Sequence, residues 1–355
     1  MSSKIPASKC AVVDLFCGAG GLSHGLLLEG FEIAAGIDVD ASCKHAFEHN
    51  NNSKFVCEDV TRFDRTRLDV LFGATETRIL AGCAPCQPFS KYAQGLPESK
   101  KWFLLKEFGR LIAETEPEVV SMENVPGLMT FKRSAVFGDF IAMLNKHGYK
   151  TATEVVYGPD YGIPQTRRRL LLLASRLGEI SFIPKTHAPE KYPTVREAIG
   201  HLPEIAAGGG SYRDRLHCAA GLSEINLRRI RAARPGGTWH EWDRSLQLDC
   251  HTAKTGRGYV AVYGRMSWDE PAPTMTTQCF GFGSGRFGHP QQDRAISLRE
   301  AAILQSFPAT YEFVPKTQDI HFKTIARMIG NAVPVTLGRV VGQSIRKHLR
   351  AVGRL

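Results

Sequence analysis

Residues 11–21 of the chain read AVVDLFCGAGG. The apolar run at 11–16 is typical of a buried parallel strand, and the glycine-rich turn after it opens a segment of helical period. Glycine at such a turn lets the backbone approach a ligand closely, and the amino terminus of the next helix presents unpaired N–H groups. The stretch predicts a strand, a turn and a helix with a ligand at the turn. A plain tight turn and a dinucleotide site are the alternatives that it leaves open.

Short apolar runs alternate with longer amphipathic segments through the first half of the chain. The runs lie at 11–16, 33–37, 78–81, 119–122, 153–156 and 170–174, and a helical period occupies 103–114. Runs of this kind are typical of buried parallel strands, and their alternation with helices predicts an α/β fold with a doubly wound mixed sheet.

The amino-acid composition of the chain changes after Pro184, where glycine, arginine and aromatic residues become frequent. A helical pattern returns from Ile325, and we expect the last helix to pack back onto the first domain. The expected division is therefore a catalytic and cofactor-binding domain at 1–188, completed by 322–355, and a smaller loop-rich domain at 189–321.

Bulk properties narrow the class of protein. The 355 residues are 43% hydrophobic and 23% charged, as in soluble globular proteins. The net charge of +10 favours a polyanionic partner, and nine scattered cysteines indicate reduced thiols. The sequence contains neither an apolar run of about 20 residues nor the apolar segment of a signal peptide. We expect a cytoplasmic, nucleoid-associated protein with no membrane contact.

Two aspartates follow the second and third expected strands. Asp38 lies in GIDVD and Asp59 in CEDV. A carboxylate at the end of the second strand can bind both ribose hydroxyls, and one at the end of the third can accept from an adenine amino group. An adenosine cofactor therefore suits this edge, although either aspartate could instead cap a helix or carry a solvated charge.

A Cys-x-x-Cys pair, Cys83 and Cys86, follows the fourth expected strand. Redox and zinc sites use this spacing. A second pair with zinc spacing is missing, however, and Pro88 suits poorly the first helical turn that would lower the thiol pKa. We expect no metal.

Four short motifs occur in order: PCQ at 85–87, ENV at 123–125, QTRRR at 165–169 and GNAVP at 330–334. With the glycine turn upstream, the set resembles the motifs of the DNA (cytosine-5) methyltransferases of bacterial restriction-modification or orphan type. The resemblance runs from Asp14 to Pro334 and is less tight over about 189–292. It implies a sheet of the S-adenosylmethionine-dependent methyltransferase type and a DNA-recognition role for the second domain.

The motif residues make chemical sense for that reaction. Carbon 5 of cytosine is a poor nucleophile, so a thiolate, expected from Cys86, must first add at carbon 6. Glu123 suits proton sharing with ring N3, and Arg169, with Arg167 second, would stabilise the developing charge. Asn124 would hold the Pro85-Cys86 turn.

By the same resemblance, the cofactor is S-adenosylmethionine. Its adenine would stack on Phe16, Asp38 would bind the ribose, and Asp59 the adenine amino group. The resemblance also assigns cofactor contacts to Gly18, Gly20, Val39, Val60 and Asn331.

The expected substrate is duplex DNA with the target cytosine flipped out of the stack. We expect residues 208–290 to read the target sequence, with Arg265 and Arg286, flanked by glycine, at base edges, and with Arg229 and its helical neighbours on phosphates. Gln165 would also order its strand, and Arg168 belongs to a solvated or phosphate-binding patch. The full set of expected DNA contacts is Gln87, Ser90, Lys91, Gln165, Arg228, Arg265 and Arg286.

Three other functions remain open. The same chemistry could act on RNA, although the long second domain rich in arginine and glycine favours duplex DNA. A sequence-specific DNA-binding protein without activity is the second, and a nicotinamide oxidoreductase is the third, disfavoured because no hydride-transfer residues accompany the glycine turn. We expect a monomer, with a cognate restriction endonuclease acting on the same site as a possible partner.

Overall fold

The computed structural model of the chain describes residues 9–85, 103–130, 135–253 and 256–355. These residues form two units: unit 1 comprises Met1–Tyr157, Arg168–Thr186 and Val333–Leu355, and unit 2 comprises Gly158–Arg167 and His187–Ala332. Residues 158–167 and 322–332 thus belong to unit 2, whereas the sequence predicts them in the first domain. Both segments bond through their backbone or side chains to the loops of unit 2, which explains the difference.

Unit 1 is built on a seven-stranded sheet with the order β3-β2-β1-β4-β5-β7-β6. Its strands are β1 (Cys10–Leu15), β2 (Glu32–Asp38), β3 (Lys54–Cys57), β4 (Thr77–Gly82), β5 (Val119–Asn124), β6 (Lys150–Tyr157) and β7 (Arg168–Ser175). The expected α/β class with a doubly wound mixed sheet is confirmed.

The last two strands correct the expected strand directions and burial. β7 runs antiparallel to both β5 and β6, so it alone is reversed and makes the sheet mixed, whereas its apolar run by itself is typical of a parallel strand. β6 is an edge strand with three exposed residues, Lys150, Thr153 and Val155, so it is not buried on both faces. A short connection through residues 158–167 reverses the chain, and such a connection can join only antiparallel neighbours.

Helices lie on both faces of this sheet, because side chains of a strand point alternately to opposite sides. Val13 and Leu15 of β1 share an apolar core with α3, α4 and α6, whereas Asp14 accepts a hydrogen bond from Ser23 of α1. The helices of unit 1 are α1 (Gly21–Leu28), η1 (Ala41–Cys43), α2 (Lys44–Asn51), η2 (Val60–Arg62), α3 (Arg65–Phe72), α4 (Phe103–Thr115), α5 (Gly127–Thr130), α6 (Ala135–Lys146) and α12 (Val335–Ala351).

The strand order reverses at β1. The chain passes from β1 to β2 and β3 on one side, and β4 then returns to pair with β1 on the other side. Loops at the carboxyl ends of two such strands diverge and leave a crevice, where ligands of α/β proteins bind. Here these loops are residues 16–20 and 83–85.

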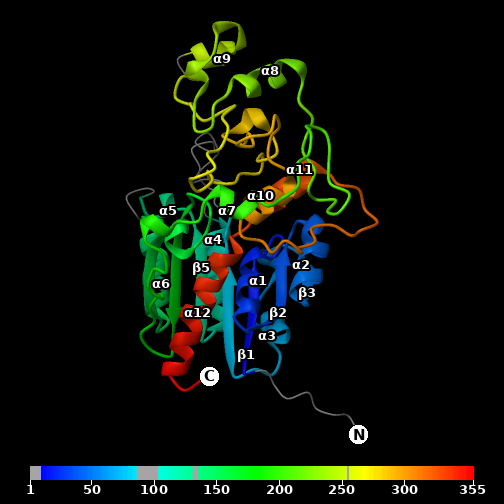
Figure 1. Cartoon of the computed structure of the whole chain (residues 1–355). Helices are drawn as coiled ribbons and strands as arrows, with labels where there is room; N and C mark the ends of the chain where they lie inside the picture. The colour runs from blue at the N-terminus through cyan, green and yellow to red at the C-terminus, as the bar shows by residue number, and fades with distance from the viewer. Residues whose placement is uncertain (1–8, 86–102, 131–134, 254–255) are drawn as a thin grey trace. The chain divides into compact units, whose positions relative to one another are not determined.

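Helix α12 packs directly against α1, as Figure 1 shows. Glycines make the close approach possible: a Cβ on Gly25 would lie 2.5 Å from the carbonyl carbon of Gly338 and 2.6 Å from the nitrogen of Arg339. The expectation that the last helix returns to the first domain is confirmed, since α12 and α1 both belong to unit 1.

Unit 2 is loop-rich, as predicted. Among its described residues, β-pairing is limited to isolated bridges. Its apolar side chains form small clusters, one around Ile230 and Phe282 and another around Trp239 and Trp242. Its helices are η7 (Gly158–Tyr161), η8 (Pro189–Lys191), α7 (Val195–Ile199), α8 (Glu224–Ala232), η9 (Trp239–Glu241), η10 (Arg244–Leu246), α9 (Asp249–Thr252), η11 (Phe282–Ser284), α10 (Leu298–Leu304) and α11 (Phe322–Asn331).

Buried arginines bind the loops of unit 2 together. Arg294 is fully buried and pairs with both carboxylate oxygens of Glu300 at 2.7 Å. Glu300 also closes a capping box with Ser297 at the start of α10. In the described part of the chain, we find no helix with the length and apolar character needed to cross a bilayer.

The contact between α1 and α12 predicts that Gly25→Ala lowers the stability of the protein. The added methyl group has no room against the backbone of α12, and overpacking of this kind costs about 1–3 kcal/mol. Thermal denaturation followed by circular dichroism measures the effect.

Gly138→Ala is the matched control. Gly138 lies on an exposed position of α6, and a Cβ there meets nothing within 4 Å. Alanine is the better helix former by about 1 kcal/mol, so this variant is expected to melt at or above the wild-type temperature. Equal melting of Gly25→Ala and wild type would contradict the proposed packing.

Candidate active site

The carboxylate of Glu123 is the most constrained group at the crevice end of unit 1. Glu123 is the second-last residue of β5 and is buried. Arg169, at the start of the neighbouring strand β7, places its Nε 2.8 Å from Oε1 of Glu123. A buried carboxylate needs such a partner because removing its charge from water is costly. The structure therefore brings together two of the expected catalytic residues.

A second group holds the other oxygen of Glu123. The thiol of Cys83 donates to Oε2 at a distance of 2.6 Å. The sequence signal for Cys83 was its place in the Cys-x-x-Cys pair, which indicated redox or metal chemistry and not a contact with Glu123. Among the described residues, no group of three or more His, Cys, Asp or Glu side chains could hold a metal ion.

Asn124 holds the beginning of the loop after β4. Its Nδ2 donates to the carbonyl of Ala84 at 3.2 Å, and its Oδ1 accepts from the backbone N–H of Val125. The contact lies next to Pro85, where the sequence predicts it. Cys86, the expected nucleophile, and the expected DNA contacts Gln87, Ser90 and Lys91 lie outside the described residues.

The QTRRR segment alternates between buried and exposed positions. Gln165 and Arg167 are buried, whereas Arg168 is exposed over the ring of Tyr157. This alternation follows from extended backbone, in which successive side chains point to opposite sides. Arg168 therefore has the surface position that the sequence predicts.

Gln165 and Arg167 have structural contacts in unit 2. Gln165 donates to Leu304 and Gln305 and accepts from the N–H of Met275. The Nη atoms of Arg167 donate to the carbonyls of Met275 and Ala332. Both side chains are committed to internal bonds, which corrects the expectation that Gln165 contacts DNA and Arg167 acts in catalysis. For Gln165, the expected ordering role agrees with these bonds.

The glycine turn after β1 forms a cradle for a ligand. Gly18 and Gly20 have φ values of +50° and +88°, in the left-handed region that side chains disfavour. A Cβ on Gly18 would meet nothing within 4 Å, so open space lies in front of this residue. The N–H of Gly18 donates to Oδ2 of Asp38 at 2.9 Å, and the backbone N–H of Asp40 donates to Oδ1. Asp38 and the turn are thereby joined, as the cofactor hypothesis requires.

Four other expected cofactor residues, Phe16, Val39, Asp59 and Val60, belong to unit 1. Phe16 is half-buried with φ +61°, and Val39, after β2, is 66% exposed although it is apolar. Asp59 is exposed and accepts from the N–H of Thr61, so it does cap η2. The side chain of Val60 is buried in the apolar core, so only its backbone remains for a ligand. Asn331 ends α11 and belongs to unit 2.

Asp14, near the end of β1, is a buried acidic residue in the strand that leads into the cradle. It is buried, its Oδ2 accepts from Ser23, and its Oδ1 has no hydrogen-bond partner among the described residues. Burial, with a smaller contribution from the nearby Asp38, raises the pKa of Asp14 to about 7, although the hydrogen bond from Ser23 lowers it. Burial also raises the pKa of Asp38, against the backbone N–H groups that lower it. An orphaned buried oxygen next to a glycine cradle fits a site built for a ligand that carries a donor or a positive charge.

The expected base-reading arginines are internal to unit 2. Arg265 is buried, donates to the carbonyls of Ile230, Ala233, His289 and Gln292, and pairs with Asp293. Arg286 is partly buried and donates to the carbonyls of Gly237 and Arg265. The bonds of Arg265 use Nε and both Nη atoms, so the expectation that it contacts a base edge is corrected. Those of Arg286 involve Nη1 alone, so its contact with a base edge stays a prediction.

A similar correction applies to Arg229, which we expected on phosphates. It is buried, donates to Leu246 and Asn226, and lies over the ring of Tyr263. Its neighbour Arg228 is exposed on the other side of α8, consistent with the expected contact with DNA.

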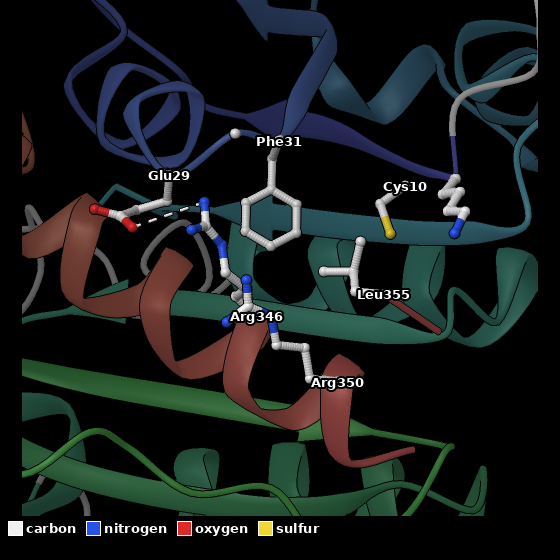
Figure 2. A pocket seen from close by; sticks show the side chains of 8 residues that line it. Cys10, Glu29, Phe31, Arg346, Arg350 and Leu355 are labelled. Atoms are coloured by element: carbon white, nitrogen blue, oxygen red, sulfur yellow. Dashed lines mark ion pairs between the residues drawn. The ribbon is translucent and has the colours of Figure 1, made fainter. Parts of the chain in front are cut away.

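Figure 2 shows a separate cavity of about 390 Å³ in unit 1. It lies at the start of β1, whereas the motif residues gather where β1, β4 and β5 end. Its lining includes Phe31, Arg346 and Arg350, and Glu29 pairs with Arg346. None of the expected site residues lines it, so the crevice end of the sheet is the candidate active site.

Comparison with known proteins identifies the family of the chain. The family described as C-5 cytosine-specific DNA methylase matches residues 10–347. The Type II methylase M.HgiDII of Herpetosiphon aurantiacus is 54% identical to the chain over 96% of both proteins. The Type II methyltransferase M.XorII of Xanthomonas oryzae is 30% identical over 95% of the chain and 85% of its own length.

Solved structures agree with the fold. A DNA modification methyltransferase encoded within a prophage of E. coli superposes with a TM-score of 0.74 at 23% identity, covering 96% of this chain and 99% of its own. DNMT2 of Spodoptera frugiperda gives 0.64 at 15% identity, covering 95% and 99%. On the extent of the family match and the identity of its relatives, the chain belongs to the C-5 cytosine-specific DNA methylase family.

Proposed function

We propose that the protein transfers a methyl group from S-adenosylmethionine to carbon 5 of a flipped-out cytosine in duplex DNA, through a covalent adduct with Cys86. Membership of the family makes the chain a DNA (cytosine-5) methyltransferase. The observation that carries the residue assignment is the Glu123 carboxylate, buried beside Arg169 at the carboxyl end of β5. This carboxylate lies at the same end of the sheet as the glycine cradle and the start of the PCQ loop, where the parallel strands have their carboxyl ends.

In the proposed reaction, the Cys86 thiolate forms a bond to carbon 6, and the electron pair of the 5,6 double bond then attacks the methyl group from carbon 5. Bound cofactor supplies this electrophilic methyl group. A base removes the proton from carbon 5, the double bond reforms, and the thiolate leaves. The products are 5-methylcytosine and S-adenosylhomocysteine, so atoms and charge balance.

Glu123 shares a proton with ring N3 while the thiolate adds, because a protonated or hydrogen-bonded N3 accepts the added electron density. Arg169 sits at Oε1 of Glu123, where its positive charge stabilises the carboxylate and the negative charge that grows on the base. Asn124 keeps the residues before Cys86 in place through Ala84.

Residues of the cradle fit the cofactor that the family uses. Gly18 leaves open space for a ligand, and the half-exposed Asp38 can bind ribose hydroxyls while Phe16 and Val39 offer apolar surface to adenine. The Asp59 side chain is exposed, so its carboxylate can accept a hydrogen bond from the adenine amino group. We assign the positive methionine end of the cofactor to the side of the cradle near Asp14, because its unsatisfied oxygen favours a donor there.

Unit 2 is the proposed DNA-recognition part of the protein, acting mainly through the exposed arginines of α8 and its neighbours. The Type II names of the relatives support a restriction-modification setting, with an endonuclease of the same target as the expected partner. We propose that the enzyme acts as a monomer on its DNA in the cytoplasm.

The covalent mechanism predicts that duplex DNA with 5-fluorocytosine at the target traps the enzyme when S-adenosylmethionine is present. Fluorine cannot leave carbon 5 as a proton, so the adduct persists and shifts the protein on a denaturing gel. Cys86→Ser is expected to form no adduct. Full methylation of ordinary DNA by Cys86→Ser would rule out this nucleophile.

The cofactor assignment predicts that Asp38→Ala weakens binding of S-adenosylmethionine by roughly 10- to 100-fold. A hydrogen bond to a charged group is worth about 1.5–3 kcal/mol. Isothermal titration calorimetry with cofactor alone measures the change. Asp139→Ala, at an exposed position of α6, is the matched loss of a carboxylate and should bind normally. Unchanged affinity of Asp38→Ala would mean that the ribose lies elsewhere.

Substitutions of the exposed Arg228 and of the buried Arg265 are predicted to have different effects. Arg228→Ala should weaken binding to all duplexes alike and reduce the slope of log affinity against log salt by about 1, as the loss of one phosphate contact does. Arg265→Ala should instead lower the melting temperature, because it leaves carbonyls and Asp293 unpaired. Fluorescence anisotropy at several salt concentrations, with melting curves, separates the two. A stable Arg265→Ala protein with relaxed sequence choice would restore the original base-contact hypothesis.

A further inference from the structure

Cys83 makes a contact that the expected chemistry does not use. The nucleophile is assigned to Cys86, yet it is the thiol of Cys83 that lies 2.6 Å from Oε2 of Glu123. We propose that Cys83 is a positioning residue, whose thiol donates to Oε2 and sets the orientation in which Glu123 meets the cytosine ring. The inference rests on the proposed function, since it assumes that Glu123 acts on the base.

The position of the thiol is set by bonds that do not involve sulfur. The backbone N–H of Cys83 donates to the carbonyl of Leu15, at the end of β1, at 3.3 Å. The next residue, Ala84, is buried and accepts from Asn124. Because neighbouring strands on both sides hold this backbone, a different side chain at position 83 leaves the loop in place.

Two donors on two oxygens fix the carboxylate more firmly than one. Rotation about the last torsion of a glutamate is broad, so the bond from Arg169 to Oε1 alone would leave the plane of the carboxylate adjustable. The thiol at Oε2 removes that freedom. Proton sharing with ring N3 needs one orientation, and a preorganised group avoids the cost of finding it during the reaction.

The weakness of a thiol as a donor suits this role. Oε2 has to exchange the thiol for the base when the cytosine enters, while the plane of the carboxylate stays as the thiol has set it. A charged donor would hold this oxygen strongly, whereas an S–H group binds it weakly and gives it up readily. Arg169 keeps its bond to Oε1 throughout, so the carboxylate stays anchored at one end.

The test compares Cys83→Ala with Cys83→Ser in single-turnover methylation of duplex DNA containing the target site. Serine keeps a donor of similar size, so Cys83→Ser should retain the wild-type rate within about 3-fold. Cys83→Ala should lower the rate at saturating DNA and cofactor by about 10- to 100-fold, the range for a misplaced catalytic group, with KM values changed less than about 3-fold. Loss of mere packing would instead affect both variants or neither.

A double-mutant cycle tests whether Cys83 acts through Glu123. Glu123→Gln is expected to be slow, and adding Cys83→Ala to it should cause no further loss, because the group that Cys83 orients is already gone. Cys10→Ser, which removes a buried thiol at the opposite end of β1, is the matched control and should methylate like wild type.

The outcomes separate the two proposals. A wild-type rate for Cys83→Ala, or an additive loss on top of Glu123→Gln, overturns the positioning role and leaves the proposed function intact. A wild-type rate for Glu123→Gln overturns the assigned role of Glu123 and the role of Cys83 with it.

Discussion

Strands β1 and β4 are hydrogen-bonded neighbours, but the chain leaves their carboxyl ends in opposite directions, toward β2 and toward β5. The loops that follow cannot pack over the same edge, so backbone stays accessible between them. The glycine cradle with Asp38 is built on one side of this point, and Cys83, Asn124 and the Glu123–Arg169 pair on the other. In the proposed function, the cofactor and the target base thus bind on opposite sides of one crevice, as the transfer of a group between two molecules requires. The reversed strand β7 contributes as well, because its direction brings Arg169, its second residue, to the end of β5.

The two units satisfy the hydrogen bonds of their buried backbone groups in different ways. In unit 1 the sheet pairs N–H and C=O groups strand by strand. In unit 2, where the described residues form only isolated bridges, buried arginines donate to the carbonyls of loops instead. Arg265 alone donates to four backbone carbonyls, two in residues 230–233 and two in residues 289–292, and Arg294 is fully buried with Glu300. An arginine has five donors in a rigid fork, which makes it well suited to collecting carbonyls that no strand satisfies. High arginine content in such a unit is therefore partly structural, and only the exposed arginines remain for DNA.

The candidate site was predictable where the pattern is local. A strand followed by a glycine turn, and an acidic residue at a strand end, each follow from a few consecutive residues, so the roles suggested for Gly18, Asp38 and Glu123 could be stated before the fold was known. The role of Cys83 could not. Its contact with Glu123 joins residues 40 positions apart, and the only local signal, a Cys-x-x-Cys spacing, indicates a different chemistry. Arg167 and Arg169 have the same side chain and neighbouring positions, yet one binds carbonyls in unit 2 and the other binds Glu123.

The sequence by itself determined the α/β class, the succession of strands and helices, the family and the residue types available for chemistry, because periodicity and short motifs are properties of adjacent residues. Only the tertiary structure decided the direction of β7, the exposure of β6, the return of residues 158–167 to unit 2, and which arginines are internal. Each of these depends on which distant segments lie side by side and on how many donors the surrounding carbonyls require. Whether an arginine faces solvent or a loop is decided by that surrounding backbone, and its own neighbours in the chain carry almost no information about it.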